Sequence, residues 1–212
     1  MARFLICRYM NITRLSNEMS KEAALEKIPW IERRERILQH RQEADQWRMI
    51  GAGLLAAYSL ALAGAKDLTI AYQSYGKPVL ANNNDLHFNL SHSGEYTACA
   101  VSDARTGVDI ERPRKTNAGV ARRCFCAEDQ KWVSEAPDPN LAFLRLWVRL
   151  ESFLKLRGTG ISEADSRFPL RGNGVPGFDI TFSDYEVNGH LLCVCGTGDR
   201  HADFIELLPE EL

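Results

Sequence analysis

The chain has 212 residues, of which 45% are hydrophobic and 25% charged, and its formal net charge is −2 at pH 7. These values are ordinary for a soluble globular protein, and the charge excludes the broad positive field of a general nucleic-acid binder. The length allows one domain or two closely packed halves. The apolar run in Met1–Arg8 is too short for a secretory leader, so we expect a cytoplasmic protein with reduced cysteines.

The first third of the chain predicts one strand followed by helices. Arg3–Tyr9 has the apolar centre of a strand, and Ser20 can cap a short helix, Lys21–Lys27, that Pro29 stops. A helical pattern then runs over Trp30–Ala63, charged in its first half and apolar in its second.

Met49 to Ala65 is uncharged and at the short limit for a membrane span. Its glycines and its continuity with the charged segment favour a buried core helix that ends near Gly64. We therefore expect no membrane association.

The rest of the chain predicts strands, then helices, then strands. The middle strands are Leu68–Tyr72, Phe88–Leu90, Tyr96–Val101 and Gly107–Glu111. Helices follow from near Thr116 through Phe125 and, after the break at Pro137 and Pro139, over Leu141–Arg157, with Asn140 as the cap and Gly158 as the stop. The predicted antiparallel strands at the end are Phe178–Phe182, Tyr185–Val187, Leu191–Cys195 and Phe204–Leu207. This order predicts an α+β fold of two similar halves, residues 1–105 and 106–212.

The six cysteines include the pairs Cys124/Cys126 and Cys193/Cys195. One intervening residue is fewer than common structural zinc sites have, so we expect buried thiols and no zinc site.

Three segments carry groups suited to phosphate and metal chemistry. Asp109 and Glu111 share one face of a predicted strand and can reach one hard cation. Glu151 and Lys155 lie four residues apart, so they share a helix face with Trp147, and Glu151 could add a third carboxylate.

The turn Ser91-His-Ser-Gly94 offers hydroxyls, an imidazole and backbone N–H groups to an anion. Taken singly, each segment also has a plain structural reading: two solvated acids on an edge strand, an exposed ion pair, or a polar turn.

Together, Phe88–Gly94, Gly107–Glu111 and Trp147-x-x-x-Glu151-x-x-x-Lys155 resemble the three signatures of the 4′-phosphopantetheinyl transferases, most closely those of the surfactin-synthetase-activating type. Tyr75-Gly-Lys-Pro78 and Gly158–Ile161 are similar to turns of that family. The resemblance spans residues 30 to 195, with order and spacing in agreement. It implies that family's fold, two α+β halves related by a pseudo-two-fold axis.

The resemblance also implies an activity: transfer of the 4′-phosphopantetheine arm of coenzyme A to a serine of an apo acyl or peptidyl carrier protein, with release of adenosine 3′,5′-bisphosphate. In family terms, Mg²⁺ would be held by Asp109, Glu111 and Glu151. The same comparison gives catalytic roles to Glu151, Lys155 and His92. Coenzyme A would be bound by residues of both halves, namely Lys77, Ser91, His92, Arg48 and Lys155.

The first half would thus be the coenzyme A phosphate side, and the second half the metal-binding and carrier-docking side. The 3′-phosphate would meet basic residues of the early helices. Of Arg33, Arg34, Arg36, Arg41 and Arg48, we favour Arg48, because it aligns with a family contact position.

The sequence departs from the family at one place. Leu150 stands where the family has a lysine, with Arg149 beside it as a candidate replacement, although adjacent helical positions point about 100° apart. The departure implies that the lysine is dispensable or that activity is reduced.

Basic and apolar residues gather in Arg112–Lys115, Arg122 and Arg123, with Val120 and Phe125, and suggest a docking surface for an acidic carrier helix. Because each half can supply one side of a cleft, we expect a monomer. Two other functions stay open: a Mg²⁺-dependent phosphodiesterase or nuclease, and a non-catalytic coenzyme A-binding homologue.

Overall fold

The computed structural model describes residues 4–115, 118–161 and 167–212. The first half contains the helices α1 (Ile12–Glu18), α2 (Lys21–Glu26), α3 (Ile31–Leu38) and α4 (Glu43–Leu62) and the 3₁₀ turn η1 (Ser74–Gly76). Its strands are β1 (Leu5–Asn11), β2 (Ile70–Tyr72), β3 (Pro78–Leu80), β4 (His87–Ser93) and β5 (Tyr96–Ser102).

The second half contains the helices α5 (Ala118–Cys124), α6 (Ala127–Glu135) and α7 (Pro139–Arg157) and the 3₁₀ turn η2 (Pro209–Glu211). Its strands are β6 (Thr106–Glu111), β7 (Ile180–Val187), β8 (His190–Thr197) and β9 (Asp203–Glu206). The structure is therefore α+β, as the sequence predicts.

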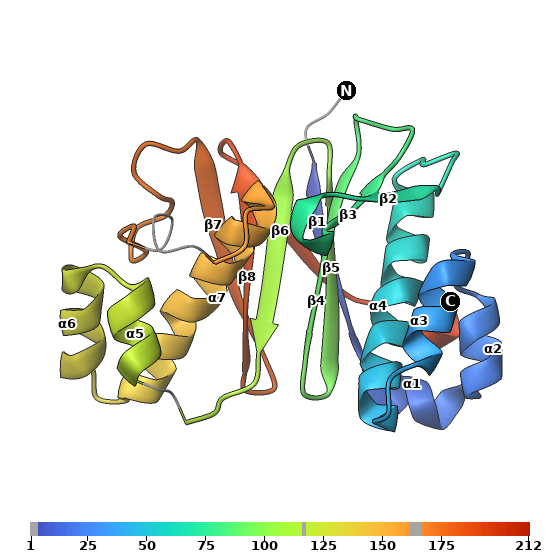
Figure 1. The fold of residues 1–212 in the computed structure, drawn as a ribbon, viewed down its shortest axis with the longest axis horizontal. Helices are drawn as coiled ribbons and strands as arrows, with labels where there is room; N and C mark the ends of the chain where they lie inside the picture. Colours follow the sequence, from blue (N-terminus) through green and yellow to red (C-terminus); the bar gives the residue numbers. More distant parts are fainter. Residues whose placement is uncertain (1–3, 116–117, 162–166) are drawn as a thin grey trace.

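Two sheets stand side by side in the centre of the molecule, with helices on both outer sides (Figure 1). One sheet has the strand order β4-β5-β1-β9 and the other β6-β8-β7, while β2 and β3 form a separate hairpin. Helices α1 to α4 cover one side, and α5 to α7 cover the other (Figure 1). The two halves therefore meet where β4 lies beside β6.

Three apolar clusters build the core. One lies under α4 in the first half, one under α7 in the second, and a third joins the two sheets. In the third, Val108 and Ile110 of β6 pack with Tyr96, Ala98 and Ala100 of β5. Burial of Val108 and Ile110 leaves the alternate residues of β6 for the opposite face, as predicted.

Gly107 permits the close approach of α7 to β6. A Cβ atom at this position would lie 2.0 Å from the carbonyl oxygen of Ser152 and 2.5 Å from the backbone nitrogen of Leu156. Both are backbone atoms of α7, so a side chain here would push the helix away. The glycine thus brings the helix that carries Glu151 and Lys155 against the strand that carries Asp109.

Several predicted elements hold. Ser20 caps α2 by accepting from the backbone N–H of Ala23, and α7 ends at Gly158, whose φ is 73°. The apolar half of the long helical pattern is the buried helix α4. Among the described residues, no helix is long and apolar enough to cross a membrane.

Other elements differ from the prediction. The pattern over Trp30–Ala63 forms two helices, α3 and α4, which are separated by the non-helical residues 39–42. The predicted break between two helices exists at residues 136–138. The cap of α7 is Asp138 and not Asn140: Asp138 accepts from two backbone N–H groups, and Pro139 is the first helical residue. The predicted helix start near Thr116 lies outside the described residues.

Two more differences involve the ends of the chain. The short helix α1, capped by Asn11, was not predicted. The predicted strand Phe204–Leu207 exists as β9, but it pairs in parallel with β1 in the first sheet, not with the antiparallel strands of the second half.

Candidate functional site

A cavity of about 560 Å³ lies where the two halves meet. Its lining includes Asp109 and Glu111 from β6, Glu151 and Lys155 from α7, and Ser91 and His92 from β4. Strand β6 and helix α7 thus bring together all the acidic residues that the sequence singles out. We call Asp109, Glu111 and Glu151 the acidic wall.

Helix α3 and strand β4 provide the opposite charge. Arg33 and Arg36 of α3 and His92 of β4 line the same cavity, and we call these three residues the basic wall. Trp147, one turn before Glu151, also lines it, as its helical spacing predicts.

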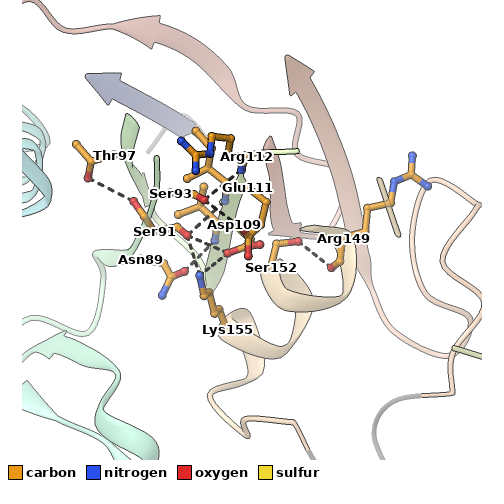
Figure 2. Close-up of polar contacts among 12 residues, drawn as sticks. Asn89, Ser91, Ser93, Thr97, Asp109, Glu111, Arg112, Arg149, Ser152 and Lys155 are labelled. Carbon is orange, nitrogen blue, oxygen red and sulfur yellow. Dashed lines mark hydrogen bonds and ion pairs between the residues drawn. The ribbon is translucent and has the colours of Figure 1, made fainter. Parts of the chain in front are cut away.

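Hydrogen bonds and ion pairs hold two residues of the acidic wall, Asp109 and Glu111. Lys155 Nζ lies 2.6 Å from Asp109 Oδ1 and 2.9 Å from Ser91 Oγ, and Ser91 Oγ donates to Asp109 Oδ1 at 2.9 Å (Figure 2). Ser93 Oγ donates to Glu111 Oε2 at 2.9 Å, and Arg114 pairs with the other oxygen of Glu111 at 3.1 Å.

The electrostatics of the cavity shift two carboxyl groups upward. Burial, with the negative charges of Asp109 and Glu111, raises the pKa of Glu151 to about 7 against the partial compensation of Lys155. Burial and the charge of Asp109 also raise the pKa of Glu111. A carboxyl group with a pKa near neutrality can give or take a proton at physiological pH.

Two residues of the basic wall, His92 and Arg33, have lowered pKa values. Loss of solvent around the ring and the positive charges of Lys155 and Arg48 lower the pKa of His92. Burial lowers the pKa of Arg33, whose Nη2 donates to the carbonyl oxygen of Met49 at 3.1 Å. The guanidinium of Arg36 lies 5.0 Å from the centre of the Tyr72 ring. The guanidinium groups of Arg33 and Arg36 would be stabilised by an anion bound between the walls.

The acidic wall offers the donors that a hard divalent cation prefers. Asp109 Oδ2 is buried and has no hydrogen-bond partner in the described structure, so one ligand atom is held ready. The pKa of Glu151 is raised by partial burial and by the charges of Asp109 and Glu111, and a bound dication would offset both effects. The residues therefore fit Mg²⁺ chemically. Within the described residues, however, no three acidic, histidine or cysteine side chains are grouped as a metal cluster, and the cation in contact with Asp109 is Lys155.

Lys77 and Arg48 make contacts other than those the sequence predicts. Lys77 Nζ donates to the carbonyl oxygens of Lys155, Leu156 and Thr106, at 2.5, 3.2 and 3.3 Å. Arg48 is paired with Asp45 and donates to the carbonyl oxygen of Gly94 at 3.1 Å. A phosphate contact by either residue would compete with these bonds, and their predicted roles in coenzyme A binding stay predictions.

The arginines of α3 differ in whether they line the cavity. Arg34 donates to the carbonyl oxygens of Ile28 and Glu26, so it stabilises the chain after α2 instead of facing the cavity. Arg33 and Arg36 lie three residues apart on α3 and both line the cavity. Their shared helix face was the available sequence signal.

Arg149 cannot take the place of the missing lysine. Its guanidinium binds Asp184 and the carbonyl oxygens of Leu170 and Gly172, and it is directed away from Asp109 and Lys155 (Figure 2). Leu150 is fully buried in the core of the second half. A second cavity of about 500 Å³ surrounds the Arg149–Asp184 pair and includes no residue of either wall.

The predicted docking surface is only partly available. Phe125 is fully buried against Phe143 and belongs to the core, which removes it from any partner surface. Arg112, Arg114, Lys115, Arg122 and Arg123 are exposed. The cysteines are free thiols, and Cys126 is only half-buried.

Comparison with known proteins agrees with the geometry. Residues 105–195 match the family model described as the 4′-phosphopantetheinyl transferase superfamily. The chain is 32% identical over 172 residues to a 4′-phosphopantetheinyl transferase of Bacillus subtilis, a match that covers 78% of this chain and 73% of that protein. It is 42% identical over 148 residues to the 4′-phosphopantetheinyl transferase psf-1 of Bacillus pumilus, with 64% of each covered. It is 32% identical over 135 residues to the transferase HetI of Nostoc sp., covering 60% of this chain and 56% of HetI.

Proposed function

The chain belongs to the 4′-phosphopantetheinyl transferase superfamily, and we propose that it transfers the 4′-phosphopantetheine arm of coenzyme A to a serine of an apo carrier protein. The observation that carries the proposal is the cavity between the acidic and basic walls, where three carboxylates and Lys155 face Arg33, Arg36 and His92. A ligand with several phosphates can satisfy the basic wall and Lys155 at once, and coenzyme A carries a pyrophosphate and a 3′-phosphate.

The reaction needs one bond made and one broken. The serine hydroxyl forms a P–O bond at the phosphorus that bears the pantetheine arm, and the bridging P–O bond of the pyrophosphate breaks. Adenosine 3′,5′-bisphosphate leaves with the electron pair of that bond. Displacement at a pyrophosphate depends on alignment and charge neutralisation more than on covalent help from the protein.

Glu151 and Lys155 have complementary parts in this scheme. Without a bound cation the pKa of Glu151 is about 7, so the group is partly ionised at neutral pH. In its ionised form it can accept the serine proton. Lys155, one turn further along α7, neutralises negative charge on the departing phosphate. Gly107 serves both roles, because it lets α7 lie against β6.

A bound Mg²⁺ would neutralise the pyrophosphate oxygens, and Asp109, Glu111 and Glu151 are the residues that would hold it. On the opposite wall, Arg33 and Arg36 would bind the 3′-phosphate in preference to Arg48, since they line the cavity and Arg48 is paired with Asp45. His92 would contact a phosphate beside them.

The carrier would dock on the exposed basic residues Arg112, Arg114, Lys115, Arg122 and Arg123, which we call the basic edge. It begins directly after Glu111, at the end of β6, so a carrier bound there would lie beside the acidic wall. A basic edge steers an acidic partner by long-range attraction.

Intact-protein mass spectrometry tests the proposal. Several apo carriers, from fatty-acid, polyketide and nonribosomal-peptide systems, are incubated with the protein, coenzyme A and Mg²⁺. We expect the carrier mass to increase by one phosphopantetheine group, and to stay unchanged when coenzyme A is omitted or the carrier serine is replaced by alanine. Coenzyme A binding without modification of any carrier, or cleavage of nucleic acid under Mg²⁺, would refute the proposal.

A further inference from the structure

Strands β4 and β6 are edge strands of different sheets, yet they lie side by side at the centre of the molecule (Figure 1). In the described structure, β4 pairs through its backbone with β5, and β6 pairs with β8. The free edge of β6 therefore needs hydrogen-bond partners other than a neighbouring strand, because buried N–H groups are costly to leave unpaired.

Side chains of β4 supply these partners. Alternate residues of a strand share a face, and three such residues of β4 accept hydrogen bonds from three alternate backbone N–H groups beginning on β6. We call Asn89, Ser91 and Ser93 the polar ladder. The bonds run from Val108 N to Asn89 Oδ1 at 2.8 Å, from Ile110 N to Ser91 Oγ at 3.3 Å, and from Arg112 N to Ser93 Oγ at 3.1 Å.

Two members of the polar ladder make a second bond, to the acidic wall. Ser91 Oγ donates to Asp109 Oδ1 and Ser93 Oγ donates to Glu111 Oε2, both at 2.9 Å (Figure 2). A serine hydroxyl has a single proton to donate. Each serine donates that proton to a carboxylate of β6. Its oxygen accepts from the backbone N–H of the residue that follows the carboxylate, Ile110 or Arg112.

Asn89 lacks this second function. The residue of β6 that corresponds to Asp109 and Glu111 in this register is Gly107, which has no carboxylate to orient. Asn89 therefore holds only the backbone of β6, whereas each serine holds the backbone and one carboxylate. The ladder thus contains its own control position.

From this difference we propose that Ser91 and Ser93 are positioning residues: they orient Asp109 and Glu111 so that both carboxylates can hold a divalent cation in the cavity. The inference rests on the proposed function, and it gives both serines a role that acts through the carboxylates. Ser93 is the better position to test, because Ser91 also accepts from Lys155 Nζ at 2.9 Å.

The experiment compares three variants of the full chain. Ser93→Ala removes the bonds to Glu111 and to the Arg112 N–H, and Ser93→Thr keeps a hydroxyl that can make both. Asn89→Ala removes the bond to the Val108 N–H, which involves no carboxylate. Mg²⁺ and Mn²⁺ binding are measured by calorimetry, and the Mg²⁺ concentration for half-maximal transfer is measured with a carrier that wild type modifies. Amide hydrogen exchange at Val108 and Arg112 measures directly whether their hydrogen bonds to Asn89 and Ser93 are present.

For Ser93→Ala we expect metal affinity to fall about tenfold, which is usual for the loss of a group that orients a metal ligand. The KM for coenzyme A at saturating Mg²⁺ should change less than about twofold, and the Arg112 amide should exchange faster. Ser93→Thr should recover wild-type metal affinity. Asn89→Ala should lower the free energy of unfolding and speed exchange at Val108. Metal affinity should stay within about twofold of wild type, because loss of the Val108 hydrogen bond leaves the bonds of Ser91 and Ser93 to both carboxylates in place.

Equal losses of metal affinity in Ser93→Ala and Asn89→Ala would overturn the inference, because the ladder would then act only through stability. Unchanged affinity in Ser93→Ala would overturn it as well. A wild-type protein that binds metal with this dependence on Ser93 but modifies no carrier would refute the proposed function while leaving the inference intact.

Discussion

The acidic and basic walls are built in different ways. Asp109 and Glu111 are each held by a hydroxyl of β4 and by a cationic side chain, and they extend from a strand whose neighbours are core residues. Arg36, by contrast, is an exposed residue on a short helix and lies against an aromatic ring. The difference agrees with the proposed roles, because groups that act at the reacting atoms need a narrow orientation, whereas groups that bind the distant end of a ligand can adapt to it.

The largest effect should follow a change in the acidic wall. Asp109→Ala removes a predicted metal ligand and the partner of Lys155, so transfer should fall about 1000-fold or more, as expected for the loss of several kcal/mol of charge stabilisation. Initial rates of carrier modification at ordinary Mg²⁺ concentrations measure it. Asp199→Ala, at an exposed loop carboxylate, is the matched control and should keep wild-type rates. Near-normal turnover in Asp109→Ala would show that the metal role is assigned to the wrong residue.

The acidic wall should also make stability depend on pH. The pKa of Glu151 is about 7 in the folded chain, against an ordinary value of 4.5. Between these values the unfolded chain has lost the proton and the folded chain retains it, so stability falls as pH rises, by up to about 3 kcal/mol in metal-free solution. Glu151→Gln should flatten this part of the profile, measured by chemical denaturation from pH 4.5 to 7.5.

Adding Mg²⁺ should change the dependence of stability on pH. A bound dication favours the ionised carboxylate, so saturating Mg²⁺ should reduce the decline in wild type and leave Glu151→Gln little changed. Parallel profiles of wild type and Glu151→Gln in metal-free solution would mean that Glu151 is not the titrating group.

A change in the basic wall should have a smaller and more selective effect. Arg36→Met removes a charge-assisted contact to phosphate, typically worth about 1.5–3 kcal/mol, so the KM for coenzyme A should rise by about 10- to 100-fold with kcat less affected. Arg41→Met, at an exposed arginine of the following turn, is the control. Coenzyme A without its 3′-phosphate should show little difference between Arg36→Met and wild type; an equal difference with both substrates would place Arg36 elsewhere on the ligand.

The smallest effect should come from the basic edge, which lies outside both walls. Arg122→Glu with Arg123→Glu should raise the KM for the carrier by about three- to tenfold, more at low ionic strength, and leave the KM for coenzyme A unchanged. Lys131→Glu, a single charge reversal on the exposed face of α6, is the control for a charge change outside the basic edge. If carrier kinetics are the same in the double variant, the carrier docks elsewhere.

Much of the acidic wall could be predicted from the sequence because its spacing is local. The two-residue spacing of Asp109 and Glu111 and the four-residue spacing of Glu151 and Lys155 each determine a shared face, and their convergence in one cavity agrees with the family resemblance. The basic wall was harder to predict from the sequence. Choosing Arg33 and Arg36 over Arg48 requires knowing that α3 and α4 are separate helices, which depends on tertiary packing.

Arg149 and Ser93 illustrate a further limit. Helical geometry alone predicts that Arg149 and Leu150 point in different directions. The partner of Arg149, however, is Asp184, a residue 35 positions later, which nothing near Arg149 in the sequence could reveal. Ser93 carries a usable signal, the alternation of Asn89, Ser91 and Ser93, but its meaning depends on β6 lying alongside. Local periodicity predicts a face, and only the fold determines what that face meets.

The parallel pairing of β9 with β1 has a consequence for how the protein is made. The last strand of the first sheet comes from the end of the chain, and the backbone N–H of Leu207, just after it, donates to the carbonyl oxygen of Tyr9 at 2.9 Å. During synthesis, this edge of β1 therefore stays uncovered until residues 203–206 have left the ribosome. We accordingly expect one cooperative unfolding transition for the two halves, because the sheet of the first is completed only by the closing residues of the second.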